Sequence, residues 1–228
     1  MPAAYRRSFS SEIVAIHART AAERQARTAS VASCGKHRDC TALCVVADDR
    51  PGLLWLISIG LAAHALDVMR AHIYCRRRPD GRTEAVDLFW VRRRGSAAAD
   101  PLDENEVDAL SATINRLLTV DPPPPPGAPA GDQTATPPYL STHVSFVVDS
   151  ESGAAMLVVE TPNRPGLLLS ITRALFEENV QIVRAEVATA GAHALDTFYV
   201  LELDGSAVTA ARRAEIEAAA RTAVFKAR

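Results

Sequence analysis

The sequence lacks any apolar run long enough to cross a lipid bilayer. Its longest apolar stretch, residues 53–63, is about half the length that a membrane helix requires, and it lies within an amphipathic repeat. The N-terminus also lacks the apolar core of a signal peptide. These absences predict a cytoplasmic chain with no membrane partner.

A large excess of charge of either sign is also missing. The 228 residues include 25 basic and 27 acidic side chains, which gives a formal net charge of −2 at pH 7. Because general affinity for nucleic acid requires a strongly basic surface, we expect no nucleic-acid partner. Hydrophobic residues make up 48% of the chain, enough for a core in each of two small domains.

Cysteine is scarce and lies only in the first third of the chain, as Cys34, Cys40, Cys44 and Cys75. The spacing Cys34-x-x-His37-x-x-Cys40 supplies three candidate metal ligands, whereas structural zinc sites usually have four and contain paired Cys-x-x-Cys spacings. Cys44 falls in a stretch that predicts a buried strand. We therefore expect reduced thiols, no metal site and no cofactor.

The chain contains one hexapeptide twice, as Asp49-Arg50-Pro51-Gly52-Leu53-Leu54 and as Asn163-Arg164-Pro165-Gly166-Leu167-Leu168. Five of the six positions match, and the two copies lie 114 residues apart (165 − 51 = 114). The stretch Arg70-Ala71-His72-Ile73 is matched at the same offset by Arg184-Ala185-Glu186-Val187. The sequence is therefore a duplicated domain.

A third pair of matching stretches is Asp87-Leu88-Phe89-Trp90-Val91 and Asp196-Thr197-Phe198-Tyr199-Val200, which lie 109 residues apart (196 − 87 = 109). The five extra residues of the first copy fall in a predicted turn at residues 76–81. Insertions of this kind lengthen a hairpin and leave the flanking strands unchanged.

Each copy predicts the element order β-α-β-β-α. A short apolar strand precedes the hexapeptide, whose proline is expected at the first position of a helix. Two strands with alternating polarity follow, and then a second helix near residues 102–119 or 208–224. The fold class is α+β, with two ferredoxin-like βαββαβ repeats, and the second repeat lacks its own C-terminal fourth strand.

Residues 142–148 form an additional predicted strand in front of the second repeat. This strand either closes the first repeat's sheet as its fourth strand, or it pairs antiparallel with the first strand of the second repeat. The short turn that follows, at residues 150–153, favours the second arrangement locally.

The predicted organisation is an N-terminal helical segment (1–40), a first repeat (41–119), a proline-rich linker (120–138) and a second repeat with its preceding strand (139–228). The linker contains five consecutive prolines, which enforce an extended conformation. The first helix of the first repeat is apolar on both faces. We expect either the N-terminal segment or another subunit to cover it.

These residues resemble the ACT domains, which are small regulatory modules with a βαββαβ fold. The resemblance rests on the hexapeptide between the first strand and the first helix, and on the Asp-x-Phe-aromatic-Val third strand. Two such repeats, together with residues 1–5 and 12–17, resemble the C-terminal regulatory region of the bifunctional uridylyltransferase/uridylyl-removing enzymes of bacterial nitrogen control.

The sequence shows no stretch that would supply the catalytic groups of such an enzyme. It has no Gly-Ser-x-x-Asp-x-Asp stretch for nucleotidyl transfer and no His…His-Asp cluster for hydrolysis, and His37-Arg38-Asp39 lacks the required adjacency. The resemblance therefore implies a non-catalytic sensor related to the regulatory end of a PII uridylyltransferase. We expect it to act as a homo-oligomer or with a separate catalytic or regulatory protein.

The resemblance also implies that a small amino acid, such as glutamine, binds at a repeat interface beside each turn. A carboxylate suits the start of a helix, and glycine leaves room for it. The expected ligand-binding residues are Asp49, Arg50, Pro51, Gly52, Leu53, Asn163, Arg164, Pro165, Gly166 and Leu167. The alternative is that these turns are only structural and that the chain is a ligand-free dimerisation scaffold for a protein partner.

Overall fold

The computed structural model describes residues 5, 8–25, 28–95, 100–119, 142–148 and 154–226. The predicted linker at residues 120–138 lies outside them. Within this described part of the chain, none of the helices combines the length and the apolar character needed to span a membrane.

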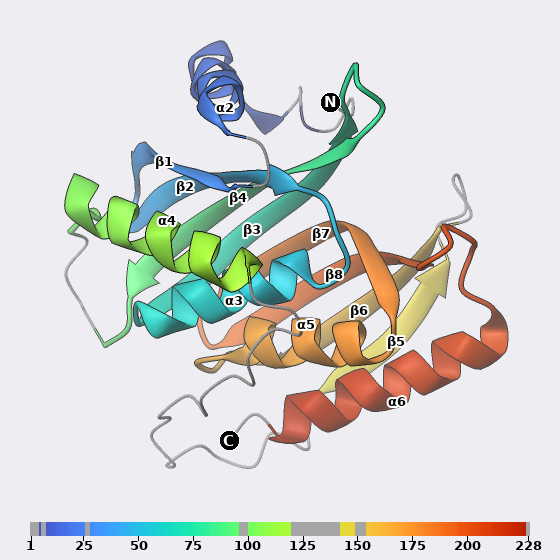
Figure 1. Ribbon diagram of the computed structural model, residues 1–228. Coiled ribbons are helices and arrows are strands. Elements are labelled where there is room, and N and C mark those ends of the chain that lie inside the picture. The colour runs from blue at the N-terminus through green and yellow to red at the C-terminus, as the bar shows by residue number, and fades with distance from the viewer. Residues whose placement is uncertain are drawn as a thin grey trace.

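The strands form one antiparallel sheet in the order β1-β2-β4-β3-β7-β8-β6-β5 (Figure 1). The first repeat contributes the first four of these positions, and the second repeat contributes the other four. In chain order the strands are β1 (Ser30–His37), β2 (Cys40–Asp48), β3 (Leu66–Arg77), β4 (Thr83–Arg93), β5 (His143–Val148), β6 (Ala155–Pro162), β7 (Val180–Ala190) and β8 (His193–Glu202).

Most of the described helices lie on one face of the sheet. That face carries α3 (Leu53–Ala63), α4 (Glu104–Leu118), α5 (Leu167–Glu177) and α6 (Ala210–Lys226) (Figure 1). Alternate residues of β2 belong to two separate cores: Leu43 and Val45 pack with these four helices, and Cys44 and Val46 pack under the N-terminal segment. The N-terminal helix α2 (Ser11–Glu23) therefore lies on the opposite face.

In the second repeat, β5 precedes the repeat and supplies the fourth strand of its half of the sheet. Strand β5 pairs with β6 from His143 opposite Glu160 to Val148 opposite Ala155. The antiparallel arrangement with the second repeat, one of the two that the sequence allowed, is therefore confirmed.

The first repeat has the same arrangement, which the sequence did not reveal. The N-terminal segment 1–40 was expected to be helical, but residues 30–37 form strand β1, which pairs antiparallel with β2. None of the residues of this edge strand is fully buried, so it shows no apolar alternation, and its pairing comes from the main chain of β2. The predicted boundary at residue 40 thus separates two paired strands.

The two repeats join through the antiparallel pairing of β3 with β7. The paired residues run from Arg70 opposite Ala188 to Tyr74 opposite Arg184, and His72 lies opposite Glu186 at the centre. His72 and Glu186 occupy equivalent positions of the two repeats, 114 residues apart. A local twofold axis therefore passes between these two residues and relates one repeat to the other.

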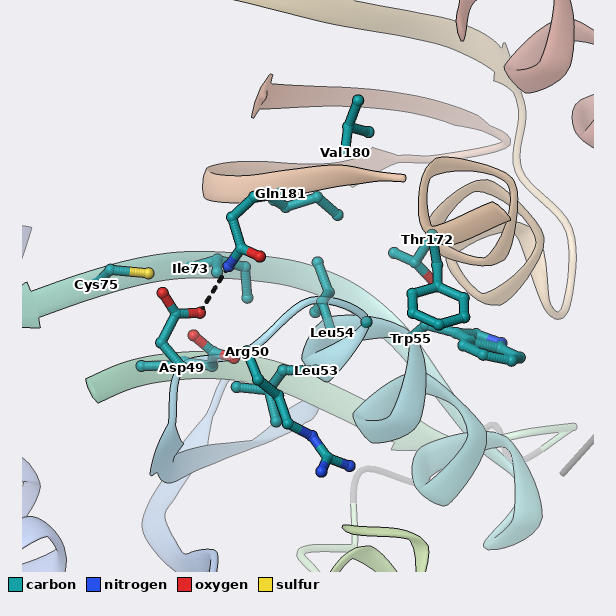
Figure 2. Close-up of a pocket in the computed structure, with 15 residues that line it drawn as sticks. Asp49, Arg50, Leu53, Leu54, Trp55, Ile73, Cys75, Thr172, Val180 and Gln181 are labelled. Carbon is teal, nitrogen blue, oxygen red and sulfur yellow. Dashed lines mark hydrogen bonds between the residues drawn. The ribbon is translucent and has the colours of Figure 1, made fainter. Parts of the chain in front are cut away.

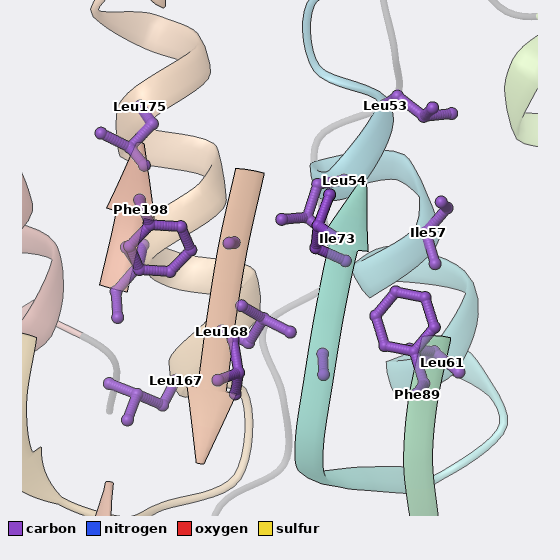
Figure 3. Packing of buried hydrophobic residues seen from close by; sticks show 14 of the residues in the cluster. Leu53, Leu54, Ile57, Leu61, Ile73, Phe89, Leu167, Leu168, Leu175 and Phe198 are labelled. Carbon is purple, nitrogen blue, oxygen red and sulfur yellow. The ribbon is translucent and has the colours of Figure 1, made fainter. Parts of the chain in front are cut away.

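Helix α3 is buried on most sides, but the N-terminal segment does not cover it as expected. Instead, α3 packs between α4 and α5. Its side chains Leu54, Ile57 and Leu61 lie on the side of the strands that carry Ile73 and Phe89 (Figure 3). Trp55 of α3 stacks on Phe176 of α5, with ring centroids 4.9 Å apart. The second apolar face of α3 is thus buried against α5 of the neighbouring repeat. This contact exists because the two repeats share one sheet.

The N-terminal segment is fastened to the first repeat by a buried arginine. The Nη2 atom of Arg24 lies 2.7 Å from Asp48 and 2.9 Å from Glu84, and its Nη1 donates to the carbonyl of Thr28 at 3.1 Å. The side chains of Arg24 and Glu84 are each 1% exposed. Arg76 and Arg78 also pair with Glu84, so the carboxylate is shared among three cations.

Replacing Arg24 by methionine should lower the free energy of unfolding by about 3 kcal/mol, because it leaves a buried carboxylate with fewer partners. Chemical denaturation of the purified variant measures this change. Arg19→Met, on an exposed position of the same helix, is the control and should change stability by less than about 0.5 kcal/mol. Equal effects of the two variants would contradict this role of Arg24.

Candidate functional site

Both repeated turns end in a glycine with a left-handed backbone. Gly52 has φ of 78° and Gly166 has φ of 76°, and each is the N-cap of its helix. The helices begin at Leu53 and Leu167. The prediction that the prolines occupy the first helical position is therefore wrong, since each proline lies two residues before its helix. Neither helix has a side-chain cap, which leaves first-turn N–H groups available to an external acceptor.

The local twofold axis places each turn against the opposite repeat. The cavity at the first turn is completed from the second repeat by Thr172, Phe176, Val180, Gln181 and Ile182. The cavity at the second turn is completed from the first repeat by the equivalent positions, Ser58, Ala62, Leu66, Asp67 and Val68. We call these two composite sites the first and the second turn cavity.

The first turn cavity is almost filled by the protein (Figure 2). Its volume is about 20 Å³, room for roughly one water molecule. The Asp49 carboxylate accepts a hydrogen bond from Nε2 of Gln181 at 2.9 Å. The Phe176 ring lies so close to Gly52 that a Cβ on this glycine would come within 2.6 Å of it.

The second turn cavity is open, with a volume of about 200 Å³. The difference follows from two substitutions between the repeats. Ala62 occupies the position equivalent to Phe176, and Leu169 occupies the position equivalent to Trp55. The stacked aromatic pair that closes the first turn cavity therefore has no counterpart in the second.

Arg164, which forms no ion pair with any of the described residues, lies in the second turn cavity. The Nε and Nη2 atoms of Arg164 are buried and have no hydrogen-bond partner within the described part of the chain. Burial lowers the pKa of this guanidinium. Unpartnered buried donors on a cation are costly, and an anionic ligand would satisfy them.

A buried carboxyl group, Asp196, also lines the second turn cavity. Its Oδ1 atom has no hydrogen-bond partner among the described residues, and burial raises its pKa to about 7. The equivalent Asp87 lines the first turn cavity, where burial and the neighbouring Asp49 raise its pKa well above the ordinary value. At neutral pH the Asp196 carboxyl is close to its point of half-ionisation, so a nearby cation would favour its charged form.

Of the ten expected ligand-binding residues, the five from Asn163 to Leu167 all line the second turn cavity. Asp49, Arg50, Gly52 and Leu53 line the first, and Pro51 lies on an open surface groove beside it. Sequence reasoning missed the opposite wall of the second turn cavity, which includes Asp67, Arg92 and Arg94. Arg94 lies 3.1 Å from Asp67, and these residues meet Asn163–Leu167 only because β3 pairs with β7.

The cysteine and histidine motif at residues 34–40 lies within the described part of the chain. In the described part of the chain, no group of three or more His, Cys, Asp or Glu side chains is placed to hold a metal ion. All four cysteines are free of disulfide bonds.

A comparison with known protein families supports the interpretation of the second repeat. Residues 155–221, within the second repeat, match the family model of the ACT domain. The second repeat thus resembles an ACT domain over most of its length, and the first repeat has the same element order and the same turn. The fold class and the resemblance predicted from the sequence are therefore confirmed.

Similarity to curated proteins extends over most of the chain. A bifunctional uridylyltransferase/uridylyl-removing enzyme from Phenylobacterium zucineum is 28% identical over 93% of this chain and 22% of that protein. The enzyme of the same name from Rhodospirillum rubrum is 30% identical over 79% of this chain and 19% of that protein. The chain thus spans about a fifth of the length of these relatives.

One solved structure, aspartate kinase from Synechocystis, also resembles the chain. The match covers 81% of this chain and 27% of the kinase, with 14% sequence identity and a TM-score of 0.45.

The buried carboxyl of Asp196 predicts a stability that falls as pH rises. Between about pH 4 and pH 7 the unfolded chain loses this proton while the folded chain keeps it, so the free energy of unfolding decreases through this window. Asp196→Asn, which mimics the neutral carboxyl, should flatten the profile and be more stable than the parent at pH 8. Asp87 acts in the same direction, so part of the slope remains.

Urea denaturation at pH 5 and at pH 8 tests this expectation. Asp108→Asn, at an exposed position, is the control and should leave the parent's profile unchanged. A variant at position 196 that is no more stable than the parent at pH 8 would refute the assignment of this pH dependence to Asp196.

Proposed function

We propose that the chain is a regulatory module that binds a small amino acid, such as glutamine, in the second turn cavity. The observation that carries this proposal is the difference between the two turn cavities: one is closed by Trp55 and Phe176, and the other is open and contains the unpartnered groups of Arg164 and Asp196. On this basis one chain holds one ligand.

The groups in the second turn cavity match the two charged ends of an amino acid. The guanidinium of Arg164 and the first-turn N–H groups of α5 would bind the α-carboxylate. The Asp196 carboxyl would accept from the α-ammonium, and the side-chain amide of Asn163 can both donate and accept. A ligand with an amide side chain, such as glutamine, would also find donors and acceptors in Ser58 and Thr189.

Regulation follows from the composite nature of this cavity. A ligand that contacts Arg164 and Asp196 on one repeat and Ser58 or Asp67 on the other binds tightly only where the two repeats are docked as they are here. A ligand shifts a conformational equilibrium only by the difference in its affinity for the two states. The proposed signal is therefore the packing of α3 against α5.

The curated relatives are named for uridylyl transfer and uridylyl removal, and the chain matches only about a fifth of their length. We infer a non-catalytic role like that of a detached regulatory region, exerted in the cytoplasm on a separate catalytic or regulatory protein or within a homo-oligomer. The alternative is a ligand-free scaffold. It is supported by exposed apolar side chains on β5 and β8 of the second repeat, such as Val147 and Leu195.

Ala62→Phe should abolish amino-acid binding, because it places in the second turn cavity the same ring that closes the first. A thermal-shift screen of the parent against the twenty amino acids should identify a ligand that raises the melting temperature, since a ligand at 100 times its Kd stabilises a protein by about 2.7 kcal/mol. The same ligand should leave the melting temperature of Ala62→Phe unchanged.

Ala63→Phe is the matched control, because it adds the same ring at an exposed position of α3 and should keep the full response. Circular dichroism without ligand establishes that both variants fold. If no amino acid shifts the parent at millimolar concentration, the sensor proposal fails and the scaffold gains support. A response that survives in Ala62→Phe would place the ligand elsewhere.

A further inference from the structure

A third cavity lies on the other face of the sheet, away from both turns. It has a volume of about 290 Å³ and lies between the start of α2 and the strands β1, β2, β3 and β4, open to solvent at Lys36, His37 and Arg70. Ser8, Phe9, Ser10 and Ile13 form its roof, and Trp90 lies in its floor. We call it the outer cavity.

The outer cavity has a basic lining. Lys36, His37, Arg70 and His72 all contribute to its wall, and none of the described residues that line it is acidic. Within the described part of the chain, neither Lys36 nor Arg70 forms an ion pair. A concave surface that is lined by two cations and by no acidic side chain favours an anionic ligand.

In the second repeat, a carboxylate balances the charge of Arg184, the residue equivalent to Arg70. There Arg184 lies over the ring of Tyr199 at 4.8 Å and pairs with the carboxylate of Glu186. In the first repeat Arg70 lies over the ring of Trp90 at 5.4 Å, but the residue equivalent to Glu186 is His72. The duplication has thus kept the arginine and the aromatic ring and replaced the internal carboxylate by a histidine.

His72 itself has an unused hydrogen-bond donor. Its Nε2 atom accepts from Nε of Arg70 at 3.0 Å, which requires the ring hydrogen to be on Nδ1. This Nδ1 atom is buried and has no partner within the described residues. Burial and the neighbouring Arg70 lower the pKa of His72, which keeps the ring neutral and leaves a buried donor unsatisfied.

Flat aromatic surfaces complete the outer cavity. The rings of Phe9 and Trp90 are nearly parallel, at 12°, with centroids 6.3 Å apart. His37 and His72 meet the Trp90 ring edge-on, at 6.2 Å and 5.5 Å. Aromatic walls of this kind favour a planar ring, because stacking adds to the apolar area that is buried.

We propose that the outer cavity binds a small anion that carries a planar ring, with its carboxylate or phosphate on Arg70, Lys36 and His72 and its ring against Phe9 or Trp90. An aromatic carboxylate and a nucleoside monophosphate share this chemistry. The site differs from the turn cavities in location and in lining, so it stands or fails independently of the proposed amino-acid site.

Tryptophan fluorescence reports on this site directly. The chain has two tryptophans, and a Trp55→Phe background leaves Trp90 as the only one. Benzoate and AMP, titrated separately, should quench or shift the Trp90 emission, and the tighter of the two identifies a carboxylate or a phosphate ligand. Cyclohexanecarboxylate and inorganic phosphate, which lack a planar ring, should bind about tenfold more weakly or not at all.

Two variants test the anion contact. His72→Glu restores the internal carboxylate that the second repeat has, and Arg70→Gln removes the cation. Each should weaken binding of the ring-bearing anion by about tenfold or more, as expected when one charge-assisted hydrogen bond is lost. Arg19→Gln removes an exposed positive charge from α2 outside the cavity and should retain the parent's affinity.

Circular dichroism confirms that each variant is folded, and Arg70→Gln suffices as a test if His72→Glu does not fold. The proposal is overturned if neither benzoate nor AMP changes Trp90 emission at tens of millimolar. It is also overturned if cyclohexanecarboxylate binds as tightly as benzoate, or if Arg70→Gln and Arg19→Gln have the same affinity.

Discussion

The antiparallel pairing of β3 with β7 is the constraint on which the rest of the structure depends. It merges two duplicated half-sheets into one and fixes the local twofold axis between His72 and Glu186. With this register, α3 and α5 must lie side by side, and each turn must face the opposite repeat. Every cavity that combines residues of both repeats follows from this pairing of a few main-chain groups.

The twofold frame also makes each repeat an internal reference for the other. Equivalent positions share a backbone environment, so comparing the two repeats shows the structural effect of each difference in side chain. Phe176 with Trp55 closes one turn cavity, whereas Ala62 with Leu169 leaves the other open. On the outer face, Glu186 neutralises Arg184, whereas His72 leaves Arg70 without a carboxylate. The duplicated chain thus keeps one architecture and has divergent sites.

The sequence predicted the elements that repeat and missed those that depend on contacts between distant segments. The duplicated hexapeptide, the alternating third strands and the separate strand at 142–148 carry local patterns, and the α+β fold follows from them. Strand β1 has no such pattern because it lies at an edge and none of its residues is fully buried. Nothing local in the sequence indicates that Asp67, Arg92 and Arg94 face Asn163–Leu167 across the repeat boundary. The ten ligand-binding residues stay a prediction.

The distribution of tight and loose packing along α3 and α5 indicates where a ligand can act. Near Gly52 the two helices are fixed by the stacked rings of Trp55 and Phe176, and a shift there would separate well-packed surfaces. Near Gly166 the small side chain of Ala62 leaves the gap unfilled. Because the sheet beneath is held by main-chain hydrogen bonds, the adjustable contact is the packing of the helices at this second end. A ligand bound there would therefore alter how α3 and α5 pack without disturbing the strands that join the repeats.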